Sequence, residues 1–122
     1  MTKARITTVM FNSTKPEELV NFWCEILQVQ AHPHNEKTEH IWLFSQEPNG
    51  FKLGFQRVAE VTAHNSQVHI DVAVDDLDTV QNLVLSLGGT HIKTTKLKNG
   101  FEWRVLADPQ GNHFCIFPEM HA

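Results

Sequence analysis

The chain has 122 residues, of which 41% are hydrophobic, 20% charged and 9% aromatic. This length predicts one domain, or two small half-domains that share a core, and it is long enough to fold without metals or disulfides. No apolar run is long enough for a transmembrane helix, and the first residues lack an apolar signal core. The net charge of −4 does not favour attraction to nucleic acid or to an anionic membrane. Two cysteines, Cys24 and Cys115, are too few for a disulfide scaffold, so we expect a reduced, cytoplasmic protein.

The first half of the chain predicts a strand, a helix and then further strands. Arg5–Phe11 is rich in β-branched and apolar residues, which favour a strand. Thr14, followed three residues later by Glu17, fits a capping box that would begin a helix over residues 15–27. Apolar residues recur in that helix at three- and four-residue spacing, namely Leu19, Phe22, Trp23, Ile26 and Leu27. Strands are then expected at Val29–His32, His40–Phe44 and Phe51–Arg57, with a turn at Glu47–Gly50.

The second half predicts the same order of elements. Gln67–Val74 favours a strand, and Asp75 or Asp76 can cap the helix that follows. The apolar stripe of this helix is Leu77, Val80, Val84 and Leu87, and Gly88-Gly89 ends it. Strands are expected at Thr90–Leu97, Phe101–Ala107 and His113–Phe117, joined by turns at Asn99-Gly100 and Asp108–Asn112.

The chain therefore predicts an α+β fold in which a β-α-β-β-β pattern occurs twice. Asn21 and Asn82 lie 61 residues apart in the two helices, and Gly50 and Gly111 lie 61 residues apart before the two final strands. We expect a single domain made of module one at about 4–58, a linker at about 59–66 and module two at about 67–118. The alternative is a generic α+β domain with two helices and no repeat.

Alternation along the strands separates a dry face from a mixed polar and aromatic face in each half. In Gln67–Val74, Ile70 and Val72 share the face that a helix would cover, whereas His69 and Asp71 share the other. The polar faces together predict a cupped cavity lined by His40, Trp42, Gln56, His69, Asp71, His113, Cys115 and Phe117. Aromatic walls with a few polar groups are typical of a small-molecule pocket. The alternatives are that these faces are solvated or form a dimer interface.

Several motifs resemble the glyoxalase/bleomycin-resistance/dioxygenase group, the vicinal-oxygen-chelate superfamily, over nearly the whole chain. They are Phe22-Trp23 with Ile26-Leu27, His69–Leu77, Leu87-Gly88, Leu53–Val58 and Leu106–Cys115. The Leu53–Val58 run and the Asn-His-Phe-Cys ending are most similar to a glyoxalase-like subgroup. The resemblance implies a pair of βαβββ modules that form an incomplete barrel around a ligand site.

The resemblance also implies where a divalent metal would be held. Enzymes of the superfamily take metal ligands from the first and last strand of each module. These four places fall on Thr8, Gly54, His69 and Cys115. Gly54 has no side chain to offer and a neutral threonine is a poor ligand, so His69 and Cys115 are the two candidate metal ligands. Because catalytic zinc normally takes three protein ligands, we expect no cofactor, with a divalent metal at His69 as the alternative.

Other residues have both a chemical and a structural interpretation. Cys115 beside His69 would make a nucleophile–base pair, but a small buried thiol is the commoner role for cysteine. Asp71 would orient His69 and raise its pKa, or would bind a ligand directly. His32 and His34 resemble a chelating pair, although the proline between them favours a solvated turn.

Three functions compete, all in a protein that we expect to be a homodimer with a small-molecule ligand. The first is a binding protein without the full metal set, similar to the bleomycin-resistance members, which Trp42, Trp103 and Phe117 favour. The second is a divergent metal-dependent lyase, isomerase or dioxygenase of the glyoxalase group that uses His69. The third is an enzyme without metal that uses His69, Asp71 or Cys115 for acid–base chemistry.

Overall fold

The computed structural model describes residues 3–61 and 67–119. Their internal packing divides the chain into two units. The first unit is Thr8–Val68. The second unit consists of His69 onwards together with the start of the chain up to Thr7. Of the predicted linker 59–66, residues 62–66 lie outside the described residues.

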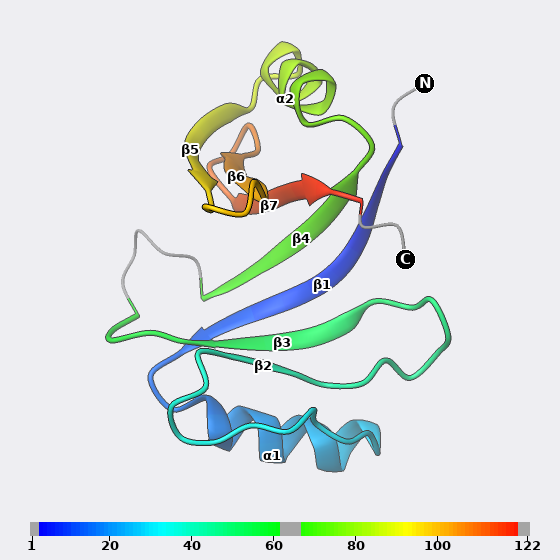
Figure 1. Cartoon of the computed structure of the whole chain (residues 1–122), viewed down its shortest axis with the longest axis vertical. Coiled ribbons are helices and arrows are strands. Elements are labelled where there is room, and N and C mark those ends of the chain that lie inside the picture. Colours follow the sequence, from blue (N-terminus) through cyan, green and yellow to red (C-terminus); the bar gives the residue numbers. More distant parts are fainter. Residues whose placement is uncertain (1–2, 62–66, 120–122) are drawn as a thin grey trace. The chain divides into compact units, whose positions relative to one another are not determined.

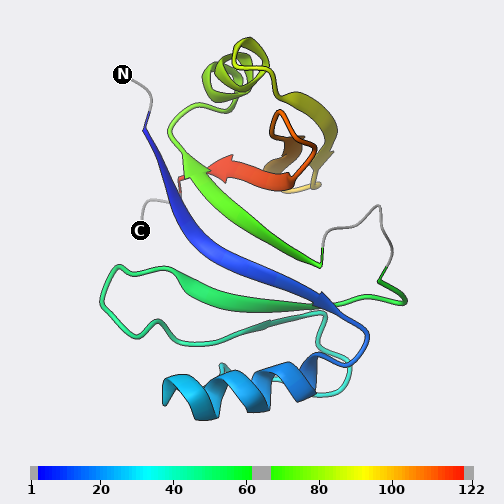
Figure 2. The same ribbon diagram turned by 180° about the vertical axis from the view of Figure 1, so that it is seen from behind.

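The first unit is a small sheet covered by one helix (Figure 1). Its elements are β1 (Ala4–Ser13, from Thr8 onwards), α1 (Pro16–Leu27), β2 (His40–Trp42) and β3 (Lys52–Arg57). The strand order is β2-β3-β1, with β1 parallel and β2 antiparallel to β3. α1 runs along one side of β2 and β3 (Figure 2), where Val20 packs with Ile41, Leu43 and Phe55.

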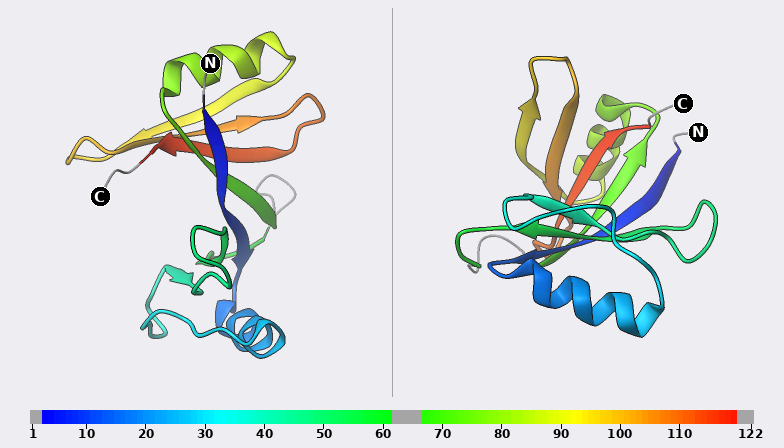
Figure 3. Two further views of the ribbon diagram at one scale, coloured as in Figure 1. Left: turned by 90° about the vertical axis from the view of Figure 1, so that its right-hand side faces the viewer. Right: turned by 60° about the horizontal axis from the view of Figure 1, so that its bottom comes forward.

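The second unit repeats this plan with more strands. It contains β4 (Val68–Val74, from His69 onwards), α2 (Leu77–Ser86), β5 (Thr90–Lys96), β6 (Glu102–Ala107) and β7 (His113–Pro118). β4 lies between the start of β1 and β7, and the order continues to β6 and β5. α2 covers one face of these strands (Figure 3), and Val74, Val80, Leu106 and Ile116 form the core beneath it. The predicted α+β class and the helix-covered face of each strand set are confirmed.

Both helices are where we expect them, but only one has the predicted cap. Asp76 is the N-cap of α2, and its carboxylate accepts a hydrogen bond from the Thr79 N–H. Thr14 does not cap α1, because the N-cap residue is Lys15, at φ −136° and ψ 68°, and the helix begins at Pro16. The carboxylate of Glu17, which the capping box required, pairs instead with the Arg57 guanidinium. A tertiary ion pair has therefore replaced the local motif.

The strand predictions hold except after α1. Val29–His32 is not a strand, since it makes one isolated bridge, from Ala31 to Leu43. The strand predicted at His40–Phe44 ends at Trp42. Beyond it, the Leu43 N–H donates to the carbonyl oxygen of Leu53, and the Phe44 N–H donates to that of Gln30. Module one is thus β-α-β-β with a bridge in place of its second strand.

Each apolar stripe is only partly buried. In α1 the buried core residue is Val20, which the predicted stripe does not include. Of the predicted stripe, Trp23 packs beside Val20, whereas Phe22 and Ile26 are 55% and 59% exposed. In α2, Leu87 is 69% exposed because the helix ends at Ser86, before the stripe does. Among the described residues, no helix is both long and apolar enough to span a membrane.

Candidate functional site

The candidate site lies on the face of the second unit opposite α2. Asp71 on β4 is paired with Cys115 on the neighbouring parallel strand β7. His69 lies two residues before Asp71, so its side chain points to the same face. The intervening residues of β4 point to α2, and Val72 packs into the core there. Strand alternation and register therefore bring the three chemically active residues together.

The three side chains form a close, largely buried group. His69 Nε2 lies 3.5 Å from Asp71 Oδ1, and these side chains are 14% and 17% exposed. One ligand atom each from His69, Asp71 and Cys115 lies within 4.8 Å of the other two. In the part of the chain that the structure describes, this is the one such group of three metal-ligating residues. The structure thus joins Asp71 to the two candidate ligands that the sequence suggests.

Burial raises the pKa of two members of this group, Asp71 and Cys115. It raises the pKa of Asp71 to about 6, although a hydrogen bond from Cys115 acts in the opposite direction. Burial, together with the charge and hydrogen bond of Asp71, raises the pKa of the Cys115 thiol to about 12. Near neutral pH the Cys115 thiol therefore keeps its proton and donates a hydrogen bond to the Asp71 carboxylate. A nucleophilic cysteine requires a lowered pKa, so these surroundings favour the interpretation of Cys115 as a structural thiol.

The backbone that carries the group is held on both sides. On one side β4 pairs with β7 from Ile70 to Val74. On the other side the Thr7 hydroxyl donates to the carbonyl oxygen of Asp71 at 3.3 Å. At the end of β4, the Asp75 N–H donates to the Lys3 carbonyl oxygen. Asp71 therefore sits on a central strand whose position is fixed by its neighbours.

Aromatic rings flank the same face. Trp103 on β6 lies two residues from Val105, which is paired with Cys115, and so it shares the face of the polar group. The Phe101 ring lies 6.0 Å from Trp103 and 6.5 Å from Phe117, measured between centroids. The sequence analysis did not include Phe101 among the pocket residues, although its spacing of two residues from Trp103 indicates that both lie on the same face of the strand.

The remaining second-unit prediction, His113, lies at the start of β7 opposite Ala107. Its spacing of two residues from Cys115 places it on the same face. We call this surface the polar face of the second unit; it consists of His69, Asp71, Phe101, Trp103, His113, Cys115 and Phe117.

The first-unit candidates form a separate cluster around an indole. His40 is paired with Gln56, and Trp42 with Gly54. The rings of His40 and Trp42 are stacked, with centroids 6.0 Å apart. The ammonium of Lys52 lies 4.9 Å from the centre of the Trp42 ring, a contact that the sequence analysis did not single out. The predicted cup would combine this cluster with the polar face of the second unit, and it stays a prediction.

The two first-unit metal places do not fit a metal. Thr8 is 3% exposed and offers a neutral hydroxyl. At Gly54, an added Cβ atom would lie 2.7 Å from Cζ3 of Trp42 and 3.0 Å from Cε of Met10. The indole thus occupies the space that a ligand side chain at Gly54 would need. The four-place metal set that the resemblance implies is therefore incomplete in this chain.

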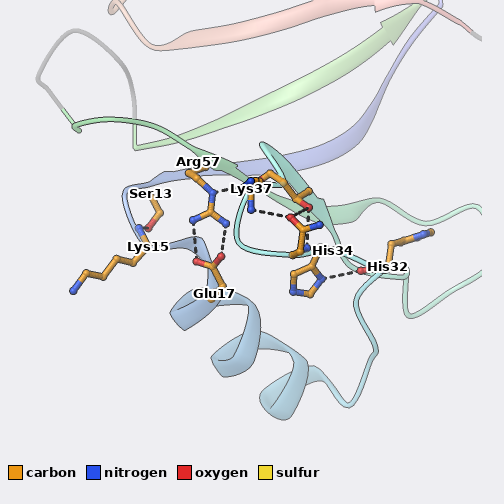
Figure 4. A network of polar contacts seen from close by, with 9 residues as sticks. Ser13, Lys15, Glu17, His32, His34, Lys37 and Arg57 are labelled. Atoms are coloured by element: carbon orange, nitrogen blue, oxygen red, sulfur yellow. Dashed lines mark hydrogen bonds and ion pairs between the residues drawn. The ribbon is translucent and has the colours of Figure 1, made fainter.

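The loop histidines belong to a structural polar network (Figure 4). Nδ1 of His34 lies 2.9 Å from the carbonyl oxygen of His32, and the His32 ring stacks on Phe44. In the same network Arg57 joins β3 to Glu17 on α1. Because each imidazole has its own partner, the turn interpretation of His32 and His34 is favoured over a chelating pair.

Comparisons with known proteins agree with this fold. A family model described as a glyoxalase-like domain matches residues 8–117. No curated protein matches the chain. A glyoxalase/bleomycin resistance protein/dioxygenase superfamily member from Vibrio splendidus has a TM-score of 0.65 at 12% identity, covering 96% of this chain and 100% of that one.

Two further solved structures share the fold. Streptomyces coelicolor methylmalonyl-CoA epimerase in complex with 2-nitronate-propionyl-CoA has a TM-score of 0.67 at 14% identity, with 97% of this chain and 96% of that one covered. The Mn(II)-bound glyoxalase from Novosphingobium aromaticivorans has a TM-score of 0.66 at 13% identity. That match covers 100% of this chain and 44% of the glyoxalase. At these identities the likeness concerns the fold.

Proposed function

Because the chain belongs to the glyoxalase-like domain family, we propose that it binds a small organic molecule on the polar face of the second unit. This binding does not use the four-place metal set of the family. A solved relative in fold holds an acyl-CoA analogue, 2-nitronate-propionyl-CoA. The proposal takes from that relative only the idea that the fold can accept a small organic ligand.

The observation that carries the proposal is the contact between Trp42 and Gly54. A residue with any side chain at Gly54 would collide with the indole, and Thr8 supplies only a buried neutral hydroxyl. Two of the four implied metal places, Thr8 and Gly54, therefore lie in packed surroundings and offer no good metal ligand. What remains on the second unit is a surface of aromatic rings around a few polar atoms, which is the usual composition of a small-molecule site.

The chemistry of the polar face indicates what it would select. Phe101, Trp103 and Phe117 offer ring faces on which a flat or aromatic ligand can stack. His69 and Asp71 belong to the same face and are mostly buried, so a bound polar group would exchange hydrogen bonds with them away from water. We therefore expect an aromatic or unsaturated ligand with at least one polar group.

A thermal-shift screen of aromatic metabolites and drugs, followed by calorimetry on chelator-treated protein, tests this function. We expect ligands that raise Tm in the native chain and lose at least tenfold in affinity when Trp103 is replaced by alanine. The matched control is Phe22→Ala, which removes an exposed ring from α1 of the other unit. Equal losses in both variants, or ligands that bind both as well as the native chain, would contradict the proposal.

The second candidate is the divergent metal-dependent lyase, isomerase or dioxygenase. The observation that favours it is the grouping of His69, Asp71 and Cys115. In such an enzyme the metal would supply Lewis-acid activation of a substrate oxygen. His69→Ala separates the candidates: activity lost together with bound metal supports the metal enzyme. Activity lost with metal content unchanged supports acid–base chemistry without metal, and no effect on either leaves the binding protein.

A further inference from the structure

Two turns of the structure carry the same triplet, an asparagine followed by glycine and phenylalanine. They are Asn49-Gly50-Phe51, between β2 and β3, and Asn99-Gly100-Phe101, between β5 and β6. The backbone nitrogen of a glycine can approach the side-chain amide of the preceding asparagine closely, because glycine has no Cβ atom in the way. We propose that Asn99 is a site of spontaneous deamidation, and that it reacts faster than Asn49. The reaction needs no bound ligand and is independent of the proposed function.

The reaction is a loss of ammonia followed by the addition of water. The backbone nitrogen of Gly100 gives its proton to a solvent base and forms a bond to Cγ of Asn99. The Cγ–Nδ2 bond breaks, the side-chain nitrogen takes up a proton and leaves as ammonia, and a succinimide ring remains. Water then opens the ring at one of its two carbonyl carbons, which gives aspartate or isoaspartate. Water is the co-reactant, and the reaction involves no oxidation or reduction.

A backbone hydrogen bond activates the Asn99 amide. Its Oδ1 accepts from the Phe101 N–H at 2.9 Å, in the turn that asparagine commonly makes with the residue two positions on. Negative charge develops on this same oxygen when the nitrogen attacks Cγ. A donor that already points at such an oxygen lowers the barrier, as an oxyanion hole does. Among the residues that the structure describes, no donor bonds to the Asn49 side chain.

The other features of the two turns are either matched or favour Asn99. Each glycine N–H donates to the carbonyl oxygen three residues back, at 2.9 Å for Gly100 and 3.0 Å for Gly50, so freeing the attacking nitrogen costs about the same in both turns. Both asparagines and both glycines are exposed to solvent base. An added Cβ at Gly100 would have no neighbour within 4 Å, whereas one at Gly50 would lie 3.1 Å from the Glu47 carbonyl oxygen. Ring closure therefore has more room at Gly100.

The two products differ in their effect on the turn. A hydrogen bond from the Leu97 N–H to the Phe101 carbonyl oxygen, 2.8 Å long, closes the turn. Isoaspartate adds a methylene group to the backbone between these two partners, so the bond cannot close in the same register. Aspartate keeps the backbone and still offers an oxygen to the Phe101 N–H. Isoaspartate therefore opens the turn, whereas aspartate preserves it.

The test is incubation of the folded chain in mildly alkaline ¹⁸O-labelled water, followed by peptide mapping with mass spectrometry. We expect the label to enter a new carboxyl group at Asn99 about two- to tenfold faster than at Asn49, the factor that one ordinary hydrogen bond provides. Asn49 in the same molecule is the matched control, because both asparagines precede Gly-Phe. In urea, where neither turn forms, the two rates should converge.

The hydrogen-bond donor is tested separately with Phe101→Pro, which removes the N–H and leaves the Asn-Gly bond in place. We expect the reaction at Asn99 to slow to the rate at Asn49. Circular dichroism and thermal unfolding establish that the variant is folded. A folded native chain in which Asn99 reacts no faster than Asn49, or a folded Phe101→Pro that reacts at the native rate, would overturn the proposal. If Phe101→Pro does not fold, the comparison of Asn99 with Asn49 in the native chain decides.

Discussion

Folding changes the protonation of the Asp71 carboxyl group in an accessible pH range. Its pKa is raised from 3.8 to about 6, so the folded state binds its proton more tightly than the unfolded state. The contribution to stability is therefore present below about pH 4 and is lost as pH rises through about 6. Two pKa units correspond to about 3 kcal/mol at most. Asp71→Asn should remove this pH dependence.

Urea unfolding of chelator-treated protein at several pH values between 4 and 7 measures the effect. The native chain should lose stability relative to Asp71→Asn as pH rises over this range. Titrating groups that do not contact Asp71 cancel in the difference between the two proteins. Parallel stability curves would mean that the carboxyl group is not desolvated.

Trp42 and Gly54 are coupled through a steric contact. A methyl group at Gly54 would meet the indole at 2.7 Å, so Gly54→Ala should destabilise the fold by roughly 1–3 kcal/mol, as overpacking usually does. In a Trp42→Leu background the same change should cost less, because the ring is gone. A double-mutant cycle by urea unfolding measures the coupling. Additive effects would show that the indole is not the obstacle.

The two helices differ in how they begin, and this can be measured. Asp76 accepts a hydrogen bond from Thr79 at the start of α2, so Asp76→Ala should cost about 1 kcal/mol. Thr14 makes no such bond at the start of α1, so Thr14→Ala should change the free energy of unfolding by less than about 0.5 kcal/mol. Chemical unfolding of both variants makes the comparison. An equal loss of unfolding free energy in the two variants would indicate that Thr14 does cap α1.

Exposed apolar residues on α1 bear on the assembly of the whole molecule. Phe22 and Ile26 present large apolar side chains that the chain itself leaves uncovered. Such surface commonly marks an interface. We predict a homodimer in solution and expect the double variant Phe22→Glu, Ile26→Glu to weaken it. Light scattering after size-exclusion chromatography gives the mass, and a native chain that elutes as a monomer at high concentration would contradict the prediction.

The sequence by itself determined the elements and their faces, because these depend on local patterns. Alternation in β4 separates His69 and Asp71 from the apolar residues that meet α2, and the structure confirms this division. Turn chemistry is equally local. The positive φ angles of Gly100 and Gly111 occur in the predicted turns. The α+β class follows from these same patterns, whereas the family resemblance rests on specific motifs such as His69–Leu77 and Leu106–Cys115.

Only the tertiary structure decided which residues meet and in what state. The contact of Asp71 with Cys115 depends on the register of two strands far apart in the sequence, and the raised pKa depends on their common burial. The indole over Gly54 depends on the pairing of β2 with β3. Glu17 does not form the predicted capping box because its carboxylate binds Arg57, which lies 40 residues away in the sequence. Such contacts join distant segments, and residue spacing along the chain carries no information about them.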